Sequence, residues 1–214
     1  MKKIVLIGDS IRMGYDKYVK EALSGVAEVY YPDENCRYAE NVLRYAHEWK
    51  KNGEWGDDVD LVHWNAGLWD VLELFGDEPL STKDYYANVI PRIDKRLRML
   101  FPNAKIVFAT STPVIEWKCA SHFKRHNATI EEYNEIAKSV LAGGDTIIND
   151  LYTLMKSAPD SYHSDSVHFY TDEGTSLIGG RVLAVICEAL SISAKEVNLE
   201  GFEPEKYSAD NIRY

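Results

Sequence analysis

The sequence has few cysteines, no excess of basic residues and no long apolar run. Its three cysteines are far apart and odd in number, so they predict neither a disulfide framework nor a CxxC metal site. The formal net charge of -10 gives no basic surface for nucleic acid, which we exclude as a partner. No apolar segment approaches the length of a membrane span, so no membrane association is expected either.

The first residues superficially resemble the start of an export signal, because Lys2 and Lys3 precede an apolar run. That run meets Gly8-Asp9 too early for a signal peptide, and no small-residue cleavage site follows. A first β-strand is the better interpretation. Together with the unpaired cysteines, this pattern predicts a cytoplasmic protein.

The chain of 214 residues is long enough for one domain with a full core. Short apolar runs alternate with amphipathic segments, which predicts strands at residues 3–7, 27–31, 61–65, 106–110 and 146–148. Helices are predicted at residues 12–23, 39–49, 83–100, 130–141 and 172–190, with Ser81 and Thr129 as N-caps and a Thr129-x-x-Glu132 capping box. This order predicts an α/β fold with a doubly wound, five-stranded parallel sheet and helices on both faces, the flavodoxin-like arrangement.

The predicted domain covers residues 1–190. Residues 191–214 form a polar, acidic tail with three aromatic residues spaced along it. We expect the tail to pack on the domain or on a partner subunit, and the sequence leaves the oligomeric state open.

Gly8-Asp9-Ser10 follows the first predicted strand and precedes the first helix. In open parallel sheets, ligands bind beyond the carboxyl ends of the strands, so the Ser10 hydroxyl is a candidate nucleophile. The N–H groups at the start of the helix favour developing negative charge. Without a base, an N-capping serine would be the commoner use of such a residue.

Asp165-Ser166-Val167-His168 lies just before the last predicted helix and supplies such a base. His168 can accept the Ser10 proton through one ring nitrogen, while Asp165 holds the other nitrogen. The nearby His163 lacks a carboxylate at the same spacing and is interpreted as a surface residue. The predicted catalytic residues are therefore Ser10, Asp165 and His168.

In combination, Gly8-Asp9-Ser10, Gly67-x-x-Asp70 and Asp165-x-x-His168 resemble the SGNH, or GDSL-type, hydrolases. The resemblance spans residues 3–190 and implies an esterase with a serine nucleophile and a histidine base. It also implies an oxyanion hole made by the serine N–H, a glycine N–H after the second strand and an asparagine side chain after the third.

Two positions depart from the pattern of that family. Cys36 stands where the glycine is expected, and Trp69 occupies the place of the asparagine. The Cys36 N–H can still donate, and Asn65 is the nearest replacement for the missing amide. The predicted oxyanion donors are therefore Ser10, Cys36 and Asn65.

Further candidate substrate contacts lie in the same loops, at Asp9, Arg37, Gly67 and Trp69. Asp9 and Arg37 also have structural interpretations, as the acceptor that holds a turn and as a surface cation. Three tryptophans at strand ends suggest a sugar-stacking wall, although core packing is the commoner use of such residues: Trp64, Trp69 and Trp117.

We therefore expect a serine esterase that hydrolyses an ester, foremost an O-acetyl group on a carbohydrate or a small polar metabolite. No cofactor and no metal are expected. Two alternatives remain open. One is an acyltransferase, thioesterase or lysophospholipase activity on the same fold, and the other is a carbohydrate-binding module with a weakened site, which the Trp69 departure favours.

Overall fold

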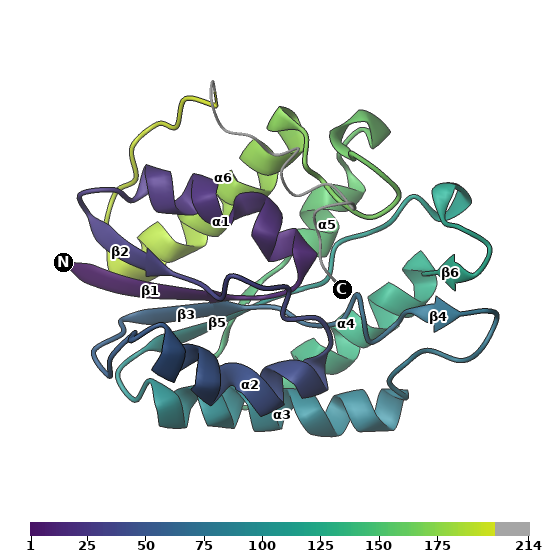
Figure 1. Cartoon of the computed structure of the whole chain (residues 1–214), viewed down its shortest axis with the longest axis horizontal. Coiled ribbons are helices and arrows are strands. Elements are labelled where there is room, and N and C mark those ends of the chain that lie inside the picture. The colour runs from purple at the N-terminus through teal and green to yellow at the C-terminus, as the bar shows by residue number, and fades with distance from the viewer. Residues whose placement is uncertain (200–214) are drawn as a thin grey trace.

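The computed structural model describes residues 1–199, which form a parallel five-stranded sheet between two layers of helices (Figure 1). The strand order is β2-β1-β3-β5-β7, and all four neighbouring pairs are parallel. This order confirms the predicted flavodoxin-like sheet. The strands are β1 (Lys2–Ile7), β2 (Ala27–Tyr30), β3 (Leu61–Trp64), β5 (Lys105–Ala109) and β7 (Ile147–Asn149).

The helices divide between the two faces of the sheet. One layer contains α1 (Ser10–Ala22), α5 (Leu151–Lys156) and α6 (Asp172–Leu190), with α1 packed against α6 (Figure 1). The other layer contains α2 (Ala39–Asn52), α3 (Lys83–Leu100) and α4 (Asn127–Leu141). β1 lies between β2 and β3, so the strand order reverses beside it, and Ser10 at its carboxyl end lies at the switch point where such sheets bind ligands.

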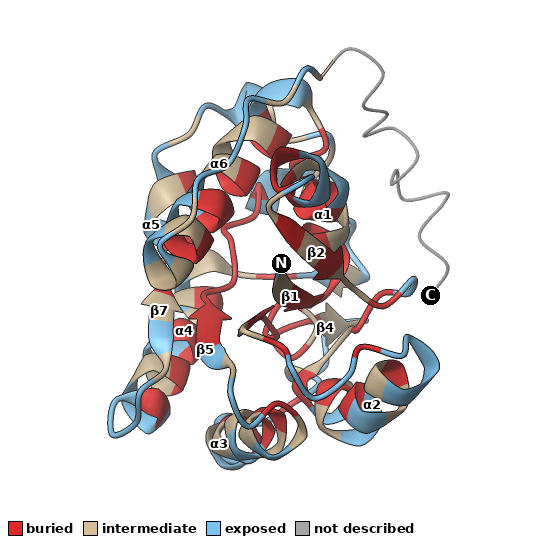
Figure 2. Cartoon of the chain, turned by 90° about the vertical axis from the view of Figure 1, so that its left-hand side faces the viewer, coloured by how far each residue is buried: buried red, intermediate tan, exposed pale blue. Residues whose placement is uncertain are grey.

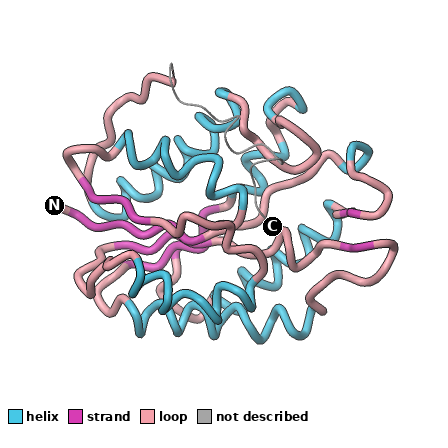
Figure 3. Tube along the Cα trace, viewed as in Figure 1, coloured by secondary structure: helices cyan, strands magenta, loops and turns pink. Residues whose placement is uncertain are grey.

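Loops gather at the carboxyl edge of the sheet, on the right of Figure 3. They contain an antiparallel pair of two-residue strands, β4 (Glu73–Leu74) and β6 (Phe123–Lys124). Two single-turn 3₁₀ helices accompany them, η1 (Glu116–Lys118) and η2 (Asp160–Tyr162). These elements and α5 are too short to leave a periodic pattern, which is why the sequence did not predict them.

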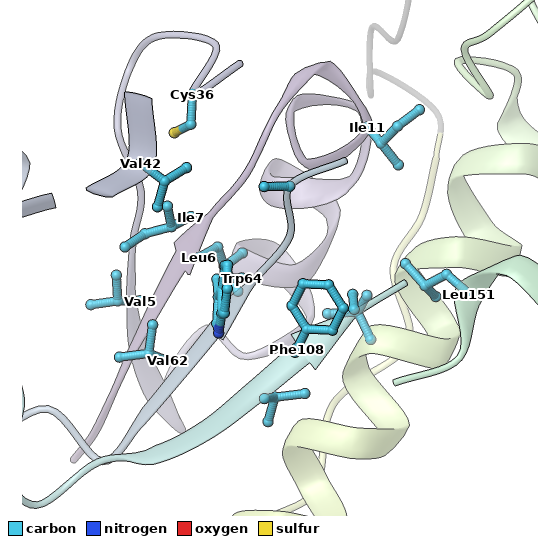
Figure 4. Close-up of a cluster of buried hydrophobic side chains, with 14 of the residues drawn as sticks. Val5, Leu6, Ile7, Ile11, Cys36, Val42, Val62, Trp64, Phe108 and Leu151 are labelled. Carbon is cyan, nitrogen blue, oxygen red and sulfur yellow. The ribbon is translucent and has the colours of Figure 1, made fainter. Parts of the chain in front are cut away.

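The core lies between the sheet and the inward faces of the helices (Figure 2). Trp64 at the end of β3 is fully buried, and its ring packs against Phe108 with centroids 4.8 Å apart (Figure 4). Trp117 is 78% exposed. The predicted wall of three tryptophans is therefore wrong, because Trp64 belongs to the core.

Two helix starts and one N-cap differ from the predictions. α1 begins at Ser10 rather than residue 12, with Asp9 as its N-cap. Thr82, not Ser81, caps α3 by accepting the N–H of Tyr85. α4 begins at Asn127, which puts Thr129 inside the helix, so the predicted capping box does not form.

The first part of the predicted tail packs on the domain. The N–H of Lys195 donates to the Ala22 carbonyl at 2.9 Å, and its ammonium pairs with Glu21 at 2.7 Å, both at the end of α1. The remainder of the tail, residues 200–214, lies outside the described residues. In the part that the structure describes, no helix combines the length and apolarity needed to cross a bilayer.

Asp70 ties the loop after β3 to the helices below the sheet. Its buried carboxylate accepts the Ala39 N–H at 3.0 Å, at the start of α2, and the Ser81 hydroxyl at 2.7 Å, just before α3. Burial raises the pKa of Asp70 to about 6, although both hydrogen bonds oppose the rise. Two of the loops that surround the site are thus fixed to one carboxylate.

This raised pKa predicts a pH-dependent stability. An unfolded aspartate titrates near pH 3.9, so the folded state holds the Asp70 proton more tightly than the unfolded state does. The favourable contribution is complete below about pH 4 and is lost as the pH rises through about 6. Asp70→Asn removes this titration, so its free energy of unfolding should gain about 2 kcal/mol relative to the wild type between pH 4 and pH 7.

Urea unfolding of both proteins at the two pH values measures this change. A difference in stability that is the same at pH 4 and pH 7 would mean that the Asp70 carboxyl titrates normally.

Candidate active site

Ser10 is the first residue of α1 and lies directly beyond the carboxyl end of β1. The Asp9 side chain caps the helix by accepting the Ile11 N–H at 2.9 Å. Gly8 is required at this turn, because a Cβ there would lie 2.0 Å from Oδ1 of Asn65. The tight turn therefore presents the Ser10 hydroxyl at the edge of the sheet.

His168 and Asp165 meet Ser10 from the other end of the chain. His168 Nε2 lies 2.8 Å from Ser10 Oγ, and His168 Nδ1 lies 2.6 Å from Oδ2 of Asp165. The second Asp165 oxygen accepts the N–H groups of Val167 at 2.6 Å and His168 at 2.7 Å. The three residues that the sequence predicts to be catalytic are thus joined by consecutive hydrogen bonds.

The electrostatics of Asp165 suit an orienting carboxylate. Partial burial alone would raise its pKa, but the hydrogen bonds and charge of His168 outweigh that cost and lower it to about 2. Asp165 is therefore ionised above pH 4. An ionised Asp165 favours a proton on His168 Nδ1 and leaves Nε2 to accept the Ser10 proton.

Tyr170 is a neighbour of this group that the sequence did not single out. Its ring stacks on His168 with centroids 4.8 Å apart, and its hydroxyl donates to the Ser10 carbonyl at 2.6 Å. Gly14 makes room for it, because a Cβ there would lie 2.5 Å from the Tyr170 ring. Tyr170 thus braces the serine and the histidine against each other.

His163 differs from its prediction as a surface residue. It is half-buried against the ring of Phe169, with centroids 3.8 Å apart. Burial lowers the pKa of His163 to about 4. It packs the loop that carries Asp165 and is not part of the hydrogen-bonded chain to Ser10.

Two of the predicted oxyanion donors are not in place. The Cys36 N–H donates to the Gly8 carbonyl at 3.1 Å, which ties the loop after β2 to the turn before Ser10. The Asn65 side chain packs against Gly8, opposes the rise that burial causes in the pKa of Asp9 and is not among the residues that line the pocket in front of Ser10. The Cys36 prediction is wrong because its N–H is used within the protein, and Asn65 lies outside the pocket wall.

Of the predicted substrate contacts, only Trp69 lines the pocket in front of Ser10. Asp9 is fully buried as the helix cap, and Arg37 adopts a left-handed φ of 54° outside the pocket lining. Gly67 has a φ of 149°, and a Cβ there would lie 2.3 Å from Ser111 Oγ. Asp9 and Gly67 therefore shape the loops, and Arg37 takes no part in the pocket wall.

The pocket has a volume of about 440 Å³ and contains Ser10, Asp165 and His168 in its wall. Trp69 and Phe123 give it aromatic surface, while Lys118 and the buried Arg125 add positive charge. The Arg125 Nε donates to the Leu68 carbonyl at 2.5 Å, which holds the β6 region to the loop after β3. Sequence reasoning missed most of this wall, because it comes from the irregular region around η1 and β6.

Another residue of the wall, Asn35, was also missed. It lies on the loop after β2 and is 3% exposed. Its position directly before Cys36, where the family glycine was expected, was the only signal in the sequence. Within residues 1–199, no group of three or more His, Cys, Asp or Glu side chains is arranged to hold a metal ion.

No protein-family model and no curated protein matches the sequence. Solved structures do match the fold. A lipase/acylhydrolase from Enterococcus faecalis aligns with a TM-score of 0.69 at 20% identity, covering 92% of this chain and all of that one. A carbohydrate esterase family 3 structure from Talaromyces cellulolyticus gives a TM-score of 0.65 at 18% identity, over 90% of this chain and all of that one.

A GDSL-like lipase from Bacteroides thetaiotaomicron also aligns with a TM-score of 0.65 at 18% identity, over 88% of this chain and 89% of that one. Identities this low establish shared architecture. The chain therefore has the α/β fold of the GDSL-type lipases and esterases, as its three sequence motifs predict.

Proposed function

We propose that this protein is a serine esterase in which Ser10 is the nucleophile, His168 the general base and Asp165 the residue that orients it. The observation that carries the proposal is the continuous pair of hydrogen bonds, 2.8 Å from Ser10 to His168 and 2.6 Å from His168 to Asp165. A serine hydroxyl needs such a base to become a nucleophile near neutral pH.

In the proposed reaction, Ser10 Oγ attacks the acyl carbonyl while His168 Nε2 takes its proton. The tetrahedral intermediate collapses, and His168 gives that proton to the leaving alcohol. Water then attacks the acyl-serine, again with His168 as base, and releases the acid. Ionised Asp165 stabilises the imidazolium that forms in both halves of the reaction.

The pocket favours a small ester with a polar portion beside an aromatic wall. Trp69 provides a flat face, and Lys118 and Arg125 provide donors around it. Similar structures include a carbohydrate esterase and an acetyl xylan esterase, which supports the same chemistry here. An O-acetyl group on a carbohydrate or a small polar metabolite is therefore our proposed substrate.

Ser10→Ala should abolish turnover of 4-nitrophenyl acetate, with kcat falling on the order of 10⁴-fold or more, because no other hydroxyl within residues 1–199 is bonded to the imidazole ring of His168. Release of 4-nitrophenolate measures the rate. Ser139→Ala, at an exposed position on α4, is the matched control and should retain full activity. Equal rates for wild type and Ser10→Ala would remove Ser10 as nucleophile.

Asp165→Asn should lower kcat on the order of 10³- to 10⁴-fold, because an amide no longer enforces the proton on His168 Nδ1. Release of 4-nitrophenolate at pH 7 measures the change. An unchanged kcat would mean that Asp165 does not orient His168.

Trp69→Ala tests the polar-ester substrate. Loss of the flat face should raise KM for an acetylated xylo-oligosaccharide by about 10-fold, the equivalent of ~1.4 kcal/mol, with a smaller change for 4-nitrophenyl acetate. Steady-state kinetics on both substrates provides the comparison. Equal changes on the two esters would mean that Trp69 does not contact the sugar portion.

A further inference from the structure

The oxyanion formed in this reaction needs donors besides the Ser10 N–H, and the expected ones are not in place. Trp69 occupies the position of the usual asparagine and has no amide. The Cys36 N–H is bonded to Gly8, and Asn65, whose side chain opposes the rise that burial causes in the pKa of Asp9, is not among the residues that line the pocket. The missing donor is therefore sought among the residues of the pocket wall.

Asn35 has the properties of that donor. It lines the same pocket as Ser10 and is 97% buried, since only 3% of its surface is exposed. Its Oδ1 accepts the Arg37 N–H at 2.9 Å, which fixes the orientation of the amide. Its Nδ2 is buried and has no hydrogen-bond partner in the protein. A buried amide without a partner is costly, so an unused donor in a pocket wall points to a ligand atom that completes it.

The backbone around Asn35 is held rigidly. Arg12 is buried in an ion pair with Asp16 and donates to the Glu34 carbonyl, both at 2.5 Å. The Glu34 side chain accepts the indole N–H of Trp49 at 2.6 Å. The residue before Asn35 is therefore anchored to α1 and α2. Fixed donors are what oxyanion stabilisation requires, because no reorganisation is needed when charge develops.

We propose that Asn35 Nδ2 is an oxyanion donor of this protein, acting with the Ser10 N–H from the loop after β2. In the family that this chain resembles, an asparagine on the loop after the third strand has this role, and we assign it here to Asn35. The inference rests on the proposed function, because the oxyanion forms only when Ser10 attacks. As a neutral side-chain amide, Asn35 stabilises negative charge without adding a titrating group to the site.

Asn35→Asp and Asn35→Ala together test this role, because the first retains the turn but adds a negative charge and the second removes the amide without adding one. Aspartate has the same shape and keeps an oxygen to accept the Arg37 N–H, so the turn is retained while the donor is lost. The probe is diethyl 4-nitrophenyl phosphate. Ser10 Oγ forms a bond to phosphorus, the aryl P–O bond breaks, 4-nitrophenolate leaves and the Ser10 proton passes to His168. The labelling rate follows from 4-nitrophenolate release, and mass spectrometry of the Ser10 peptide confirms the site.

We expect Asn35→Asp to slow labelling by roughly 100- to 1,000-fold, the usual loss for one oxyanion donor. Asn41→Asp is the matched control, because it makes the same change on a nearby amide that faces the Cys36 carbonyl. It should slow labelling by less than about 5-fold. Thermal unfolding checks both variants, and Asn35→Ala, which adds no charge, decides the question if Asn35→Asp is unfolded at the assay temperature.

The outcomes separate the two proposals. If wild type is labelled at Ser10 and the folded Asn35 variant reacts within about 5-fold of it, the Asn35 assignment is wrong and the nucleophile stands. If wild type is not labelled at Ser10 at all, the proposed nucleophile fails and Asn35 has no oxyanion to stabilise.

Discussion

The site depends on one long-range contact, the hydrogen bond that joins Ser10 to His168 across 158 positions of sequence. Neither residue can reach the other through local structure. β1 delivers Ser10 to the carboxyl edge of the sheet, and the loop before α6 delivers His168 there, because α6 packs against α1. Tyr170 completes the arrangement by contacting both residues. Sheet order and helix packing thus determine whether the hydroxyl meets its base.

Three carboxylates near this edge illustrate how environment assigns roles to one side-chain type. Asp165 is partly exposed and paired with His168, so its pKa falls and it carries the negative charge that an imidazolium needs. Asp9 and Asp70 are fully buried, and burial raises the pKa of both despite their hydrogen bonds. They accept backbone N–H groups at the starts of α1 and α2. The proposed proton transfer therefore depends on the ionised Asp165, whereas the buried Asp9 and Asp70 hold the backbone around the site.

The sheet and the Ser10–His168–Asp165 arrangement could be predicted because their signals are local. Buried parallel strands are short apolar runs, and Asp165-x-x-His168 places acid and base on a single turn. Other features depend on contacts that no spacing encodes. Asn65 lies near Ser10, but only the tertiary structure shows that its side chain lies beside Asp9 and does not line the pocket. The pocket wall around η1 and β6 is irregular chain, which leaves no periodic pattern in the sequence.

The positions that depart from the family pattern, Cys36 and Trp69, lie on loops, whereas Ser10 and His168 occupy positions that the fold determines. The proposed nucleophile follows β1 and the proposed base precedes α6, and the 2.8 Å contact between them requires those two segments to meet at the switch point. An oxyanion donor needs only to reach one point in space, and the loops after β2 and β3 both border that point. An amide on either loop satisfies the same electrostatic requirement. Under the two proposals, Trp69 provides a flat surface for the substrate where the resemblance places an amide donor, and Asn35 on the neighbouring loop provides the donor. Arg12, buried with Asp16 and bonded to the Glu34 carbonyl, holds the backbone beside Asn35.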